Sequence, residues 1–266
     1  MIRDITIGQY YPADSILHKL DPRVKFVATM VYIISLFVAS SWVVYALSAV
    51  FLVGSIVLSK VPFGFMVRGL KPILMILAIT LFFNLILTPG DVVFSVWILK
   101  ITKEGIVLAV KMAIRLIFLI MGASVMTLTT TPNQLTDGLE RLLSPLNVIH
   151  VPVHEIAMMM SIALRFIPIL MEETDRIMKA QKARGADFES GNLIEKAKAM
   201  VPLLVPLFMS AFRRAHDLAM AMDARCYRGG EGRTKMKPLR YEASDRKAYA
   251  ILVLYLVAMI VTGRLF

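Results

Sequence analysis

Long apolar runs separated by short polar breaks constrain this chain more than any other feature. A helix needs about 20 mostly apolar residues to cross a bilayer, and its backbone must be hydrogen-bonded internally because no water is available there. Such runs occupy residues 24–39, 42–58, 72–87, 106–128 and, near the end, 248–261. With 58% hydrophobic and only 18% charged residues, the sequence predicts an all-α polytopic membrane protein with about five transmembrane helices.

Start and stop signals flank several of these runs. Asp21-Pro22-Arg23 places a capping carboxylate before a proline at the first helical position, where the missing N–H does no harm. Thr88-Pro89-Gly90 predicts a turn after the third run, and the β-prone residues between it and Glu104 predict a small hairpin or interfacial loop. In the last run, we expect Tyr249 and Tyr255 to lie toward the membrane interfaces.

Residues 172–246 are too polar for a bilayer core. They hold 15 Lys or Arg against 11 Asp or Glu. The apolar runs beside or within them are short: 156–171 is interrupted by Arg165 and Pro168, and 199–212 contains two prolines. We therefore expect both runs to lie on or between other helices and not to cross the membrane alone.

The basic residues predict the orientation of the chain. Arg3, Lys19, Arg23 and Lys25 lie in or just after the N-terminal segment, and the break after the first run has no basic residue. Because basic loops stay in the cytoplasm, the N-terminus is predicted to be cytoplasmic and the C-terminus external. The prediction is a multi-pass plasma-membrane protein in three parts: transmembrane helices in 1–130, a cytoplasmic domain in 131–246 and a C-terminal transmembrane helix in 247–266.

Motifs for catalysis, cofactors and metals are missing from the sequence. Neither a phosphate-binding G-x-x-x-x-G-K-[ST] loop nor a Gly-x-Ser-x-Gly elbow is present. His154-Glu155 begins like a zinc-protease motif, but Met158 stands where the second histidine belongs, and Pro152 separates His150 from His154. We predict no enzymatic activity, no cofactor and no metal.

The net charge of +11 does not indicate nucleic acid, since no basic run is interleaved with stacking aromatic residues. Anionic lipid headgroups or acidic protein partners explain the sign of the charge. Cys226 is the single cysteine, so the chain has no internal disulfide.

Two amphipathic helical segments between Pro168 and Gly230 end in the same way. Each closes on a small residue, an arginine and another small residue: Ala183-Arg184-Gly185 and Ala224-Arg225-Cys226. One interpretation is a helix C-terminus, where an arginine complements the helix dipole. The repetition, with alanines three or four residues before each arginine, favours a second one, in which each guanidinium contacts a carboxylate or carbonyls of a partner.

Aligning Arg184 on Arg225, which lie 41 positions apart, shows a weak repeat of apolar and small residues. The charges do not repeat, because Glu172 and Glu173 fall on Arg213 and Arg214. This opposition predicts two helices that cross.

At these residues the chain resembles the transmembrane T component of energy-coupling factor transporters, which carries a pair of Ala-Arg-Gly motifs. The first motif matches in full, and the second departs from the pattern by Cys226 in place of glycine. Residues 8–15 (Gly-Gln-Tyr-Tyr-Pro-Ala-Asp-Ser) and 18–23 (His-Lys-Leu-Asp-Pro-Arg) also look like the T component that is shared between several transporters. The resemblance covers nearly the whole chain.

The resemblance implies a non-enzymatic coupling subunit of an ABC importer for vitamins or other micronutrients. In that family each coupling helix docks one of two ABC-type ATPase subunits through its arginine, and the T component passes the ATPase movement to a small membrane-embedded, substrate-binding S component. We accordingly expect Ala183, Arg184, Gly185, Ala224, Arg225 and Cys226 to dock the ATPases. The 18 methionines suggest an adaptable surface for exchangeable S components, although methionine also fills apolar cores.

Two other functions stay open at this point. A secondary transporter could use Lys111, Arg115 and Arg165 along a path, but such proteins carry inverted repeats of membrane segments, whereas the repeat here lies in the polar part. For Lys111 and Arg115 we expect positions toward one end of their helix. A membrane-anchored scaffold without transport would differ only in its partners.

Overall fold

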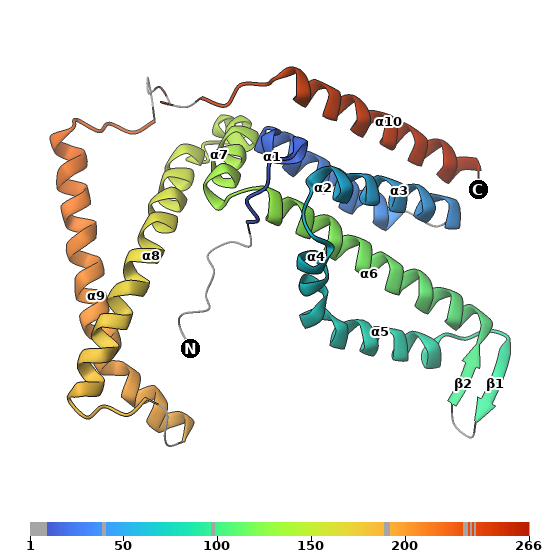
Figure 1. Cartoon of the computed structure of the whole chain (residues 1–266), viewed down its shortest axis with the longest axis horizontal. Coiled ribbons are helices and arrows are strands. Elements are labelled where there is room, and N and C mark those ends of the chain that lie inside the picture. The colour runs from blue at the N-terminus through green and yellow to red at the C-terminus, as the bar shows by residue number, and fades with distance from the viewer. Residues whose placement is uncertain are drawn as a thin grey trace. The chain divides into compact units, whose positions relative to one another are not determined.

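The computed structural model describes residues 10–38, 41–96, 99–188, 192–230, 234, 236 and 238–265, most of which are helical (Figure 1). In chain order the helices are α1 (Ile16–Lys19), α2 (Pro22–Val38), α3 (Trp42–Ser59), α4 (Phe63–Leu70), η2 (Lys71–Ile73), α5 (Leu74–Leu87), α6 (Lys103–Thr129), α7 (Pro132–Leu143), η3 (Ser144–Ile149), α8 (Val153–Ala183), α9 (Leu193–Ala224) and α10 (Ala243–Leu265). The predicted all-α, polytopic membrane architecture is confirmed.

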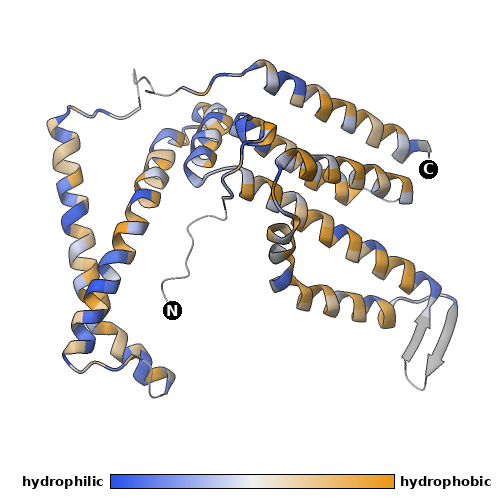
Figure 2. Cartoon of the chain, in the orientation of Figure 1, coloured by the Kyte–Doolittle hydropathy of each residue, from blue (hydrophilic) through white to orange (hydrophobic). Residues whose placement is uncertain are grey.

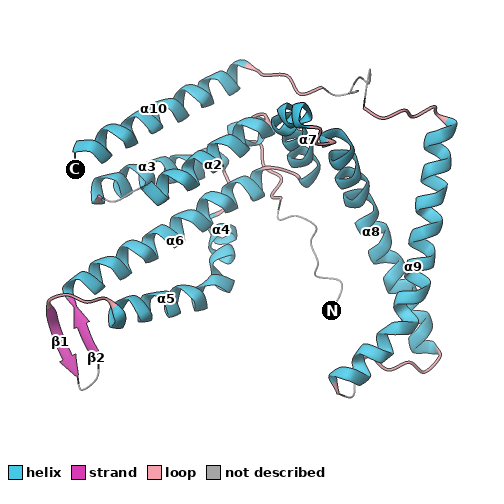
Figure 3. Cartoon of the chain, turned by 180° about the vertical axis from the view of Figure 1, so that it is seen from behind, coloured by secondary structure: helices cyan, strands magenta, loops and turns pink. Residues whose placement is uncertain are grey.

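The strands β1 (Val92–Val96) and β2 (Leu99–Thr102) form an antiparallel hairpin between α5 and α6 (Figure 3). Val96 pairs with Leu99 next to the turn, and the register shifts between Val92 and Phe94. This is the small hairpin that the β-prone residues predicted; residues 97 and 98 lie outside the described part of the chain.

The chain divides into two compact units. One comprises Gly8–Gly138 and Leu239–Phe266, and therefore holds α1 to α6 and α10; we call it the membrane unit. The other comprises Met1–Ile7 and Leu139–Pro238, and holds η3, α8 and α9; we call it the helix-pair unit. The boundary falls inside α7, and each unit is described by itself below.

In the membrane unit, α2, α3, α6 and α10 lie side by side (Figure 1). Their shared core contains nine buried residues: Tyr32, Leu36, Val44, Tyr45, Leu52, Met121, Leu252, Tyr255 and Met259. α6 also packs against α4 and α5. Hydropathy follows this arrangement, since Figure 2 shows α3, α5 and α6 as mostly hydrophobic along their length.

Tyr255 corrects one expectation, because it lies in the core and not toward an interface. Its hydroxyl is 2.6 Å from the hydroxyl of Ser35 and 3.3 Å from that of Ser48, so α10 is hydrogen-bonded to both α2 and α3. The ring stacks on Phe51 with centroids 4.4 Å apart. A tyrosine is tolerated here because its phenol finds polar partners inside the bundle.

The start of α2 carries the cap that the sequence predicted. Asp21 accepts a hydrogen bond from the backbone N–H of Arg23 at 2.9 Å, and its carboxylate also pairs with the Arg23 guanidinium at 2.7 Å. Its own backbone N–H donates to Asp245 at 2.9 Å, which joins the starts of α2 and α10. The guanidinium of Arg23 lies 3.8 Å from the ring centroid of Tyr241.

Lys25 is a buried cation that holds helix ends together, a role that sequence reasoning did not find. Its side chain is only 7% exposed, and its Nζ donates to the carbonyl oxygens of His18 at 3.1 Å and Thr129 at 2.9 Å. These carbonyls lie at the ends of α1 and α6, where helical partners are lacking. The contact also shows that α6 runs antiparallel to α2.

Among the described residues, four helices are long and apolar enough to cross a membrane: α3, α6, α8 and α10. Helices also form at the first and third predicted spans, but α2 has 17 residues and α5 has 14. The presence of α8 among the four differs from our expectation, which treated Arg165 and Pro168 as interruptions. Pro168 does not end the helix, which runs continuously over 31 residues. That this segment does not cross the membrane alone stays a prediction.

Candidate docking site

The two arginine motifs end the two long helices of the helix-pair unit. α8 has 31 residues with Pro168 inside it, and α9 has 32 residues with Pro202 and Pro206 inside it. A proline removes one backbone hydrogen bond and bends a helix without always ending it. At its N-terminus α9 carries a capping box, in which Asn192 and Glu195 each bond the other's backbone N–H.

α8 and α9 cross in an antiparallel sense (Figure 1). Arg214 Nη2 donates to Glu173 Oε2 at 2.6 Å, and farther along the pair Gln181 Nε2 donates to the carbonyl of Pro202 at 3.4 Å. The residue number thus rises along α8 while it falls along α9. The prediction of crossing helices with opposed charges is confirmed.

Antiparallel packing places the two arginines on opposite sides of the crossing. Arg184 lies 11 residues beyond Glu173, and Arg225 lies 11 residues beyond Arg214. At 1.5 Å per helical residue, each arginine is about 16 Å from the ion pair, in opposite directions, so the two ends are roughly 30 Å apart.

The environment of Glu173 at the crossing also lowers the pKa of its carboxyl group. Hydrogen bonds from Ser210 and from Arg214 lower the pKa of the Glu173 carboxyl, because both stabilise its charged form. The carboxylate is therefore ionised at neutral pH and available to pair with Arg214.

The end of α8 is closed by a Schellman motif. Arg184 is the last half-helical residue, and Gly185 follows with a left-handed φ of +87°. The N–H of Gly185 donates to Lys182 and that of Ala186 to Gln181, both at 3.0 Å, which satisfies the last carbonyls of the helix. This motif turns the chain sharply after the arginine.

The end of α9 repeats this geometry although its third residue is not glycine. Arg225 occupies the same capping position, and Cys226 adopts a left-handed φ of +55°. The N–H of Cys226 donates to Asp223 at 2.9 Å and that of Tyr227 to Met222 at 3.1 Å. Cys226 therefore takes the conformation of the expected glycine, at a cost of about 1–2 kcal/mol for a residue with a Cβ atom.

Both ends are exposed. Arg184 and Arg225 face solvent, as do the alanines before them, Ala180, Ala183, Ala221 and Ala224. In the described part of the chain neither guanidinium pairs with a carboxylate. Each helix thus ends in a low alanine surface from which one unpaired guanidinium projects, and such a group can bind a carboxylate or a row of carbonyls in two-point fashion.

The end of α9 is also fixed against the start of α8. Gly230 lies against the ring of His154 so closely that a Cβ atom at this position would be 2.6 Å from it. His154 Nδ1 is in turn 3.0 Å from Glu140 Oε1. A glycine is therefore required at 230, and sequence reasoning assigned it only a helix-stop role.

His150 and His154 do not lie on one continuous helix, as predicted. His150 has a left-handed φ of +62° after η3, outside the helix that carries His154. The described residues contain no group of three or more His, Cys, Asp or Glu side chains that could hold a metal ion.

Two of the three basic residues proposed for an alternative transport path, Lys111 and Arg115, belong to the membrane unit. Arg115 Nε donates to the hydroxyl of Tyr45 at 3.1 Å, and Lys111 Nζ is 5.5 Å from the ring centroid of Trp42. Trp42 and Tyr45 belong to the first turn of α3. Arg115, however, lies near the middle of α6 (Lys103–Thr129), so the expectation of a position toward one end of its helix was wrong for this residue. Arg165 belongs to α8, in the other unit.

Comparisons with known proteins match nearly the whole chain. The family model CbiQ, described as a cobalt transport protein, matches residues 13–236. The chain is 55% identical over 267 residues to the energy-coupling factor transporter transmembrane protein EcfT of Clostridium kluyveri, covering 100% of this chain and 98% of that protein. It is 53% identical to the protein of that name in Ruminiclostridium cellulolyticum, with full coverage of both, and 47% identical to that of Bacillus subtilis, covering 95% and 96%.

Proposed function

Because this chain belongs to the family of CbiQ and EcfT transporter membrane proteins, we propose that it is the coupling subunit of an energy-coupling factor importer. In this role it carries conformational change from two ABC-type ATPase subunits to a membrane-embedded S component that binds a vitamin or another micronutrient. ATP is hydrolysed in the partners, and this chain performs no chemistry.

The observation that carries the proposal is the pair of matched helix ends. Two arginines with the same cap geometry project from opposite ends of one antiparallel pair, about equally far from its central ion pair. A single small partner would not reach both ends, whereas two ATPase subunits can take one end each. The residues assigned to docking are Ala183, Arg184 and Gly185 at one end, and Ala224, Arg225 and Cys226 at the other.

Each docking contact rests on charge and on close approach. The alanine surface lets a groove of the ATPase reach the helix backbone, and the guanidinium then pairs with a carboxylate or with carbonyls inside that groove. Because the two helices are joined at Glu173 and Arg214, a change in the distance between the ATPases would alter their crossing. That change is the signal passed to the S component.

The exposed apolar face of α9 is the surface that we assign to the S component. It includes Val201, Val205, Phe208 and Phe212, which recur at helical spacing and are 52–70% exposed. Met200, Met209 and Met220 lie beside them and are also exposed, so this surface can repack against more than one S component.

With the orientation predicted from the basic residues, the N-terminus and residues 131–246 are cytoplasmic, and the chain is a multi-pass protein of the plasma membrane.

Affinity purification with both ATPase subunits tests the proposal. We expect Arg184→Glu and Arg225→Glu each to reduce recovery of one ATPase at least tenfold, and not the same one, because losing a charged contact in an interface costs 2 kcal/mol or more. Lys179→Glu on α8 and Arg228→Glu beyond α9 are matched controls, since both residues are exposed basic side chains near the motifs. Undiminished recovery in the double variant would refute the docking assignment.

A second experiment tests the exchange of S components. Co-expression with several S components is expected to yield a mixture of complexes that share this chain. If one S component alone is recovered whatever the others' abundance, the subunit is dedicated and not shared.

A further inference from the structure

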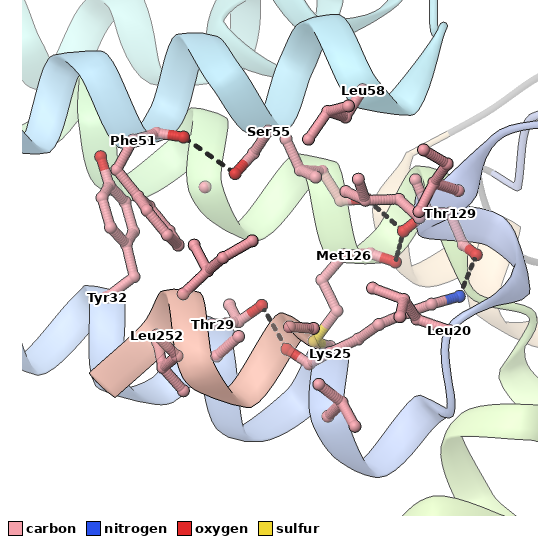
Figure 4. A pocket seen from close by; sticks show the side chains of 18 of the residues that line it. Leu20, Lys25, Thr29, Tyr32, Phe51, Ser55, Leu58, Met126, Thr129 and Leu252 are labelled. Atoms are coloured by element: carbon pink, nitrogen blue, oxygen red, sulfur yellow. Dashed lines mark hydrogen bonds between the residues drawn. The ribbon is translucent and has the colours of Figure 1, made fainter. Parts of the chain in front are cut away.

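The membrane unit contains a cavity of about 540 Å³ between α1, α2, α3, α6 and α10. Figure 4 shows it as an elongated space with Tyr32 and Phe51 at one end and Leu20, Lys25 and Thr129 at the other. Lys25 and Tyr32 are seven residues apart on α2, which corresponds to about 10 Å along the helix. Cavities of this volume accommodate small ligands.

The lining of the cavity is apolar over most of its surface. Val24, Leu52, Val125 and Leu252 form buried walls, and the hydroxyl of Ser55, which also lines it, donates back to the carbonyl of Phe51 at 2.9 Å. The hydroxyl of Thr29 is likewise hydrogen-bonded within its own helix, since it donates to the carbonyl of Lys25 at 2.8 Å. These walls suit a hydrocarbon chain and offer little to a polar solute.

The rim of the cavity is apolar and exposed. Ile16 is 61% exposed, Leu58 47% and Ile251 56%, and they belong to α1, the end of α3 and the first half of α10. In a helix bundle that crosses a membrane, such residues face lipid, so the ligand that meets this opening is a lipid chain and not a solute from water.

One end of the cavity is basic. Lys247 lines it from the first turns of α10, and the hydrogen bond between the Asp21 N–H and Asp245 puts that part of α10 level with the start of α2. Lys247 is exposed and, in the described part of the chain, pairs with no carboxylate. The nearby carboxylates are engaged, because Asp21 pairs with Arg23 and Asp245 accepts the backbone N–H groups of Asp21 and Glu242.

We propose that this cavity binds one acyl chain of an anionic phospholipid, whose phosphate lies beside Lys247. The chain enters between the end of α3 and the start of α10 and lies along α2 toward Tyr32. The headgroup stays at the membrane surface where α2 and α10 begin, because a phosphate would not enter the apolar walls. The lipid thereby bridges the N-terminal helices and α10, which are distant in sequence.

Native mass spectrometry of the purified full chain tests this site, with dioleoylphosphatidylglycerol and dioleoylphosphatidylcholine as the two probes. The wild type is expected to retain one phosphatidylglycerol, with about a fivefold preference over phosphatidylcholine. A preference of this size corresponds to the attraction between one basic residue and an anionic headgroup. Ser55→Phe fills the cavity and should abolish retention. Gly54→Phe adds the same ring at the neighbouring position, where a Cβ atom has nothing within 4 Å, and should leave retention unchanged.

The headgroup is tested separately. Lys247→Gln should remove the preference for phosphatidylglycerol, whereas Arg246→Gln, an exposed basic neighbour that does not line the cavity, should keep it. Because Lys247 is exposed, this variant is expected to fold even if Ser55→Phe does not. Equal retention of both lipids by the wild type, or full retention by a folded Ser55→Phe variant, would overturn the proposal. The measurement needs neither an ATPase nor an S component, so its failure would leave the docking proposal standing.

Discussion

Glu173 accepts a 2.6 Å hydrogen bond from Arg214, and the 41 positions between them equal the separation of Arg184 and Arg225. The alignment of the two arginine motifs superposed this glutamate and this arginine, and in the structure they form an ion pair between α8 and α9. The contact is therefore equidistant in sequence from both exposed arginines. In a pair of helices joined in this way, a movement of either arginine-bearing end can change the angle at which α8 and α9 cross.

Exchange of the two charges tests the contact. Glu173→Arg and Arg214→Glu should each destabilise the chain, and the double variant should recover part of the loss. Arg214 is 39% exposed, so we expect a coupling of only about 0.2–1 kcal/mol in a double-mutant cycle, read from thermal unfolding in detergent. The exposed neighbour Glu172→Arg is the control, and a coupling as large for Glu172 with Arg214 would contradict the assignment.

The same pair predicts a dependence on pH. The folded pKa of Glu173 is lowered, first by the hydrogen bond from Ser210 and then by that from Arg214, below its ordinary value of 4.5. A lowered carboxyl pKa contributes stability that is present above the unfolded pKa and is lost as the pH falls through the folded pKa. The difference in melting temperature between wild type and Glu173→Gln should thus be constant from pH 8 to pH 6 and shrink below about pH 4.5. A difference that does not change over the acidic range would argue against a titrating contact.

The two cap residues should respond in opposite directions to substitution. Gly185→Ala is expected to destabilise the end of α8 by about 1–2 kcal/mol through the left-handed φ alone, because a Cβ atom there meets nothing within 4 Å. Cys226→Gly should stabilise the end of α9 by a similar amount, since glycine adopts φ +55° without strain. Melting temperatures measure both effects, and a Cys226→Gly variant less stable than wild type would show that the thiol makes a compensating contact.

Removal of the buried cation in the membrane unit should be costly. Lys25→Met leaves the carbonyls of His18 and Thr129 without their hydrogen bonds, for an expected loss of about 1–3 kcal/mol for each unpaired group. Lys19→Met, whose side chain is exposed on the preceding helix, is the matched control and should change little. Equal melting temperatures for wild type and Lys25→Met would mean that other groups, such as water, replace the ammonium.

Much of the architecture could be predicted from the sequence because hydrophobic runs and cap residues act locally. The apolar runs predicted helices where α2, α3, α5, α6 and α10 lie, and Asp21-Pro22 predicted the start of α2. The proline was misleading in α8, where Pro168 does not interrupt the helix. A proline weakens a helix locally, but whether the helix continues depends on packing against its neighbours, which no local signal reports.

The two arginine motifs could be recognised in the sequence because they combine residue type, spacing and repetition. Arg184 and Arg225 were predicted as exposed helix ends, and they are. Their placement on opposite sides of a crossing required the antiparallel contact between Glu173 and Arg214. Opposed charges at equivalent positions indicated a crossing but not its direction.

By itself, the sequence determined that the chain is a helical membrane protein and that two arginines close two amphipathic helices, since both follow from composition and short-range pattern. Tertiary structure decided the rest. It put Tyr255 in the core, because Ser35 and Ser48 supply partners from distant helices. It also gave Cys226 the backbone conformation of a glycine, because the carbonyls of Met222 and Asp223 needed the hydrogen bonds that only a left-handed residue at this position provides.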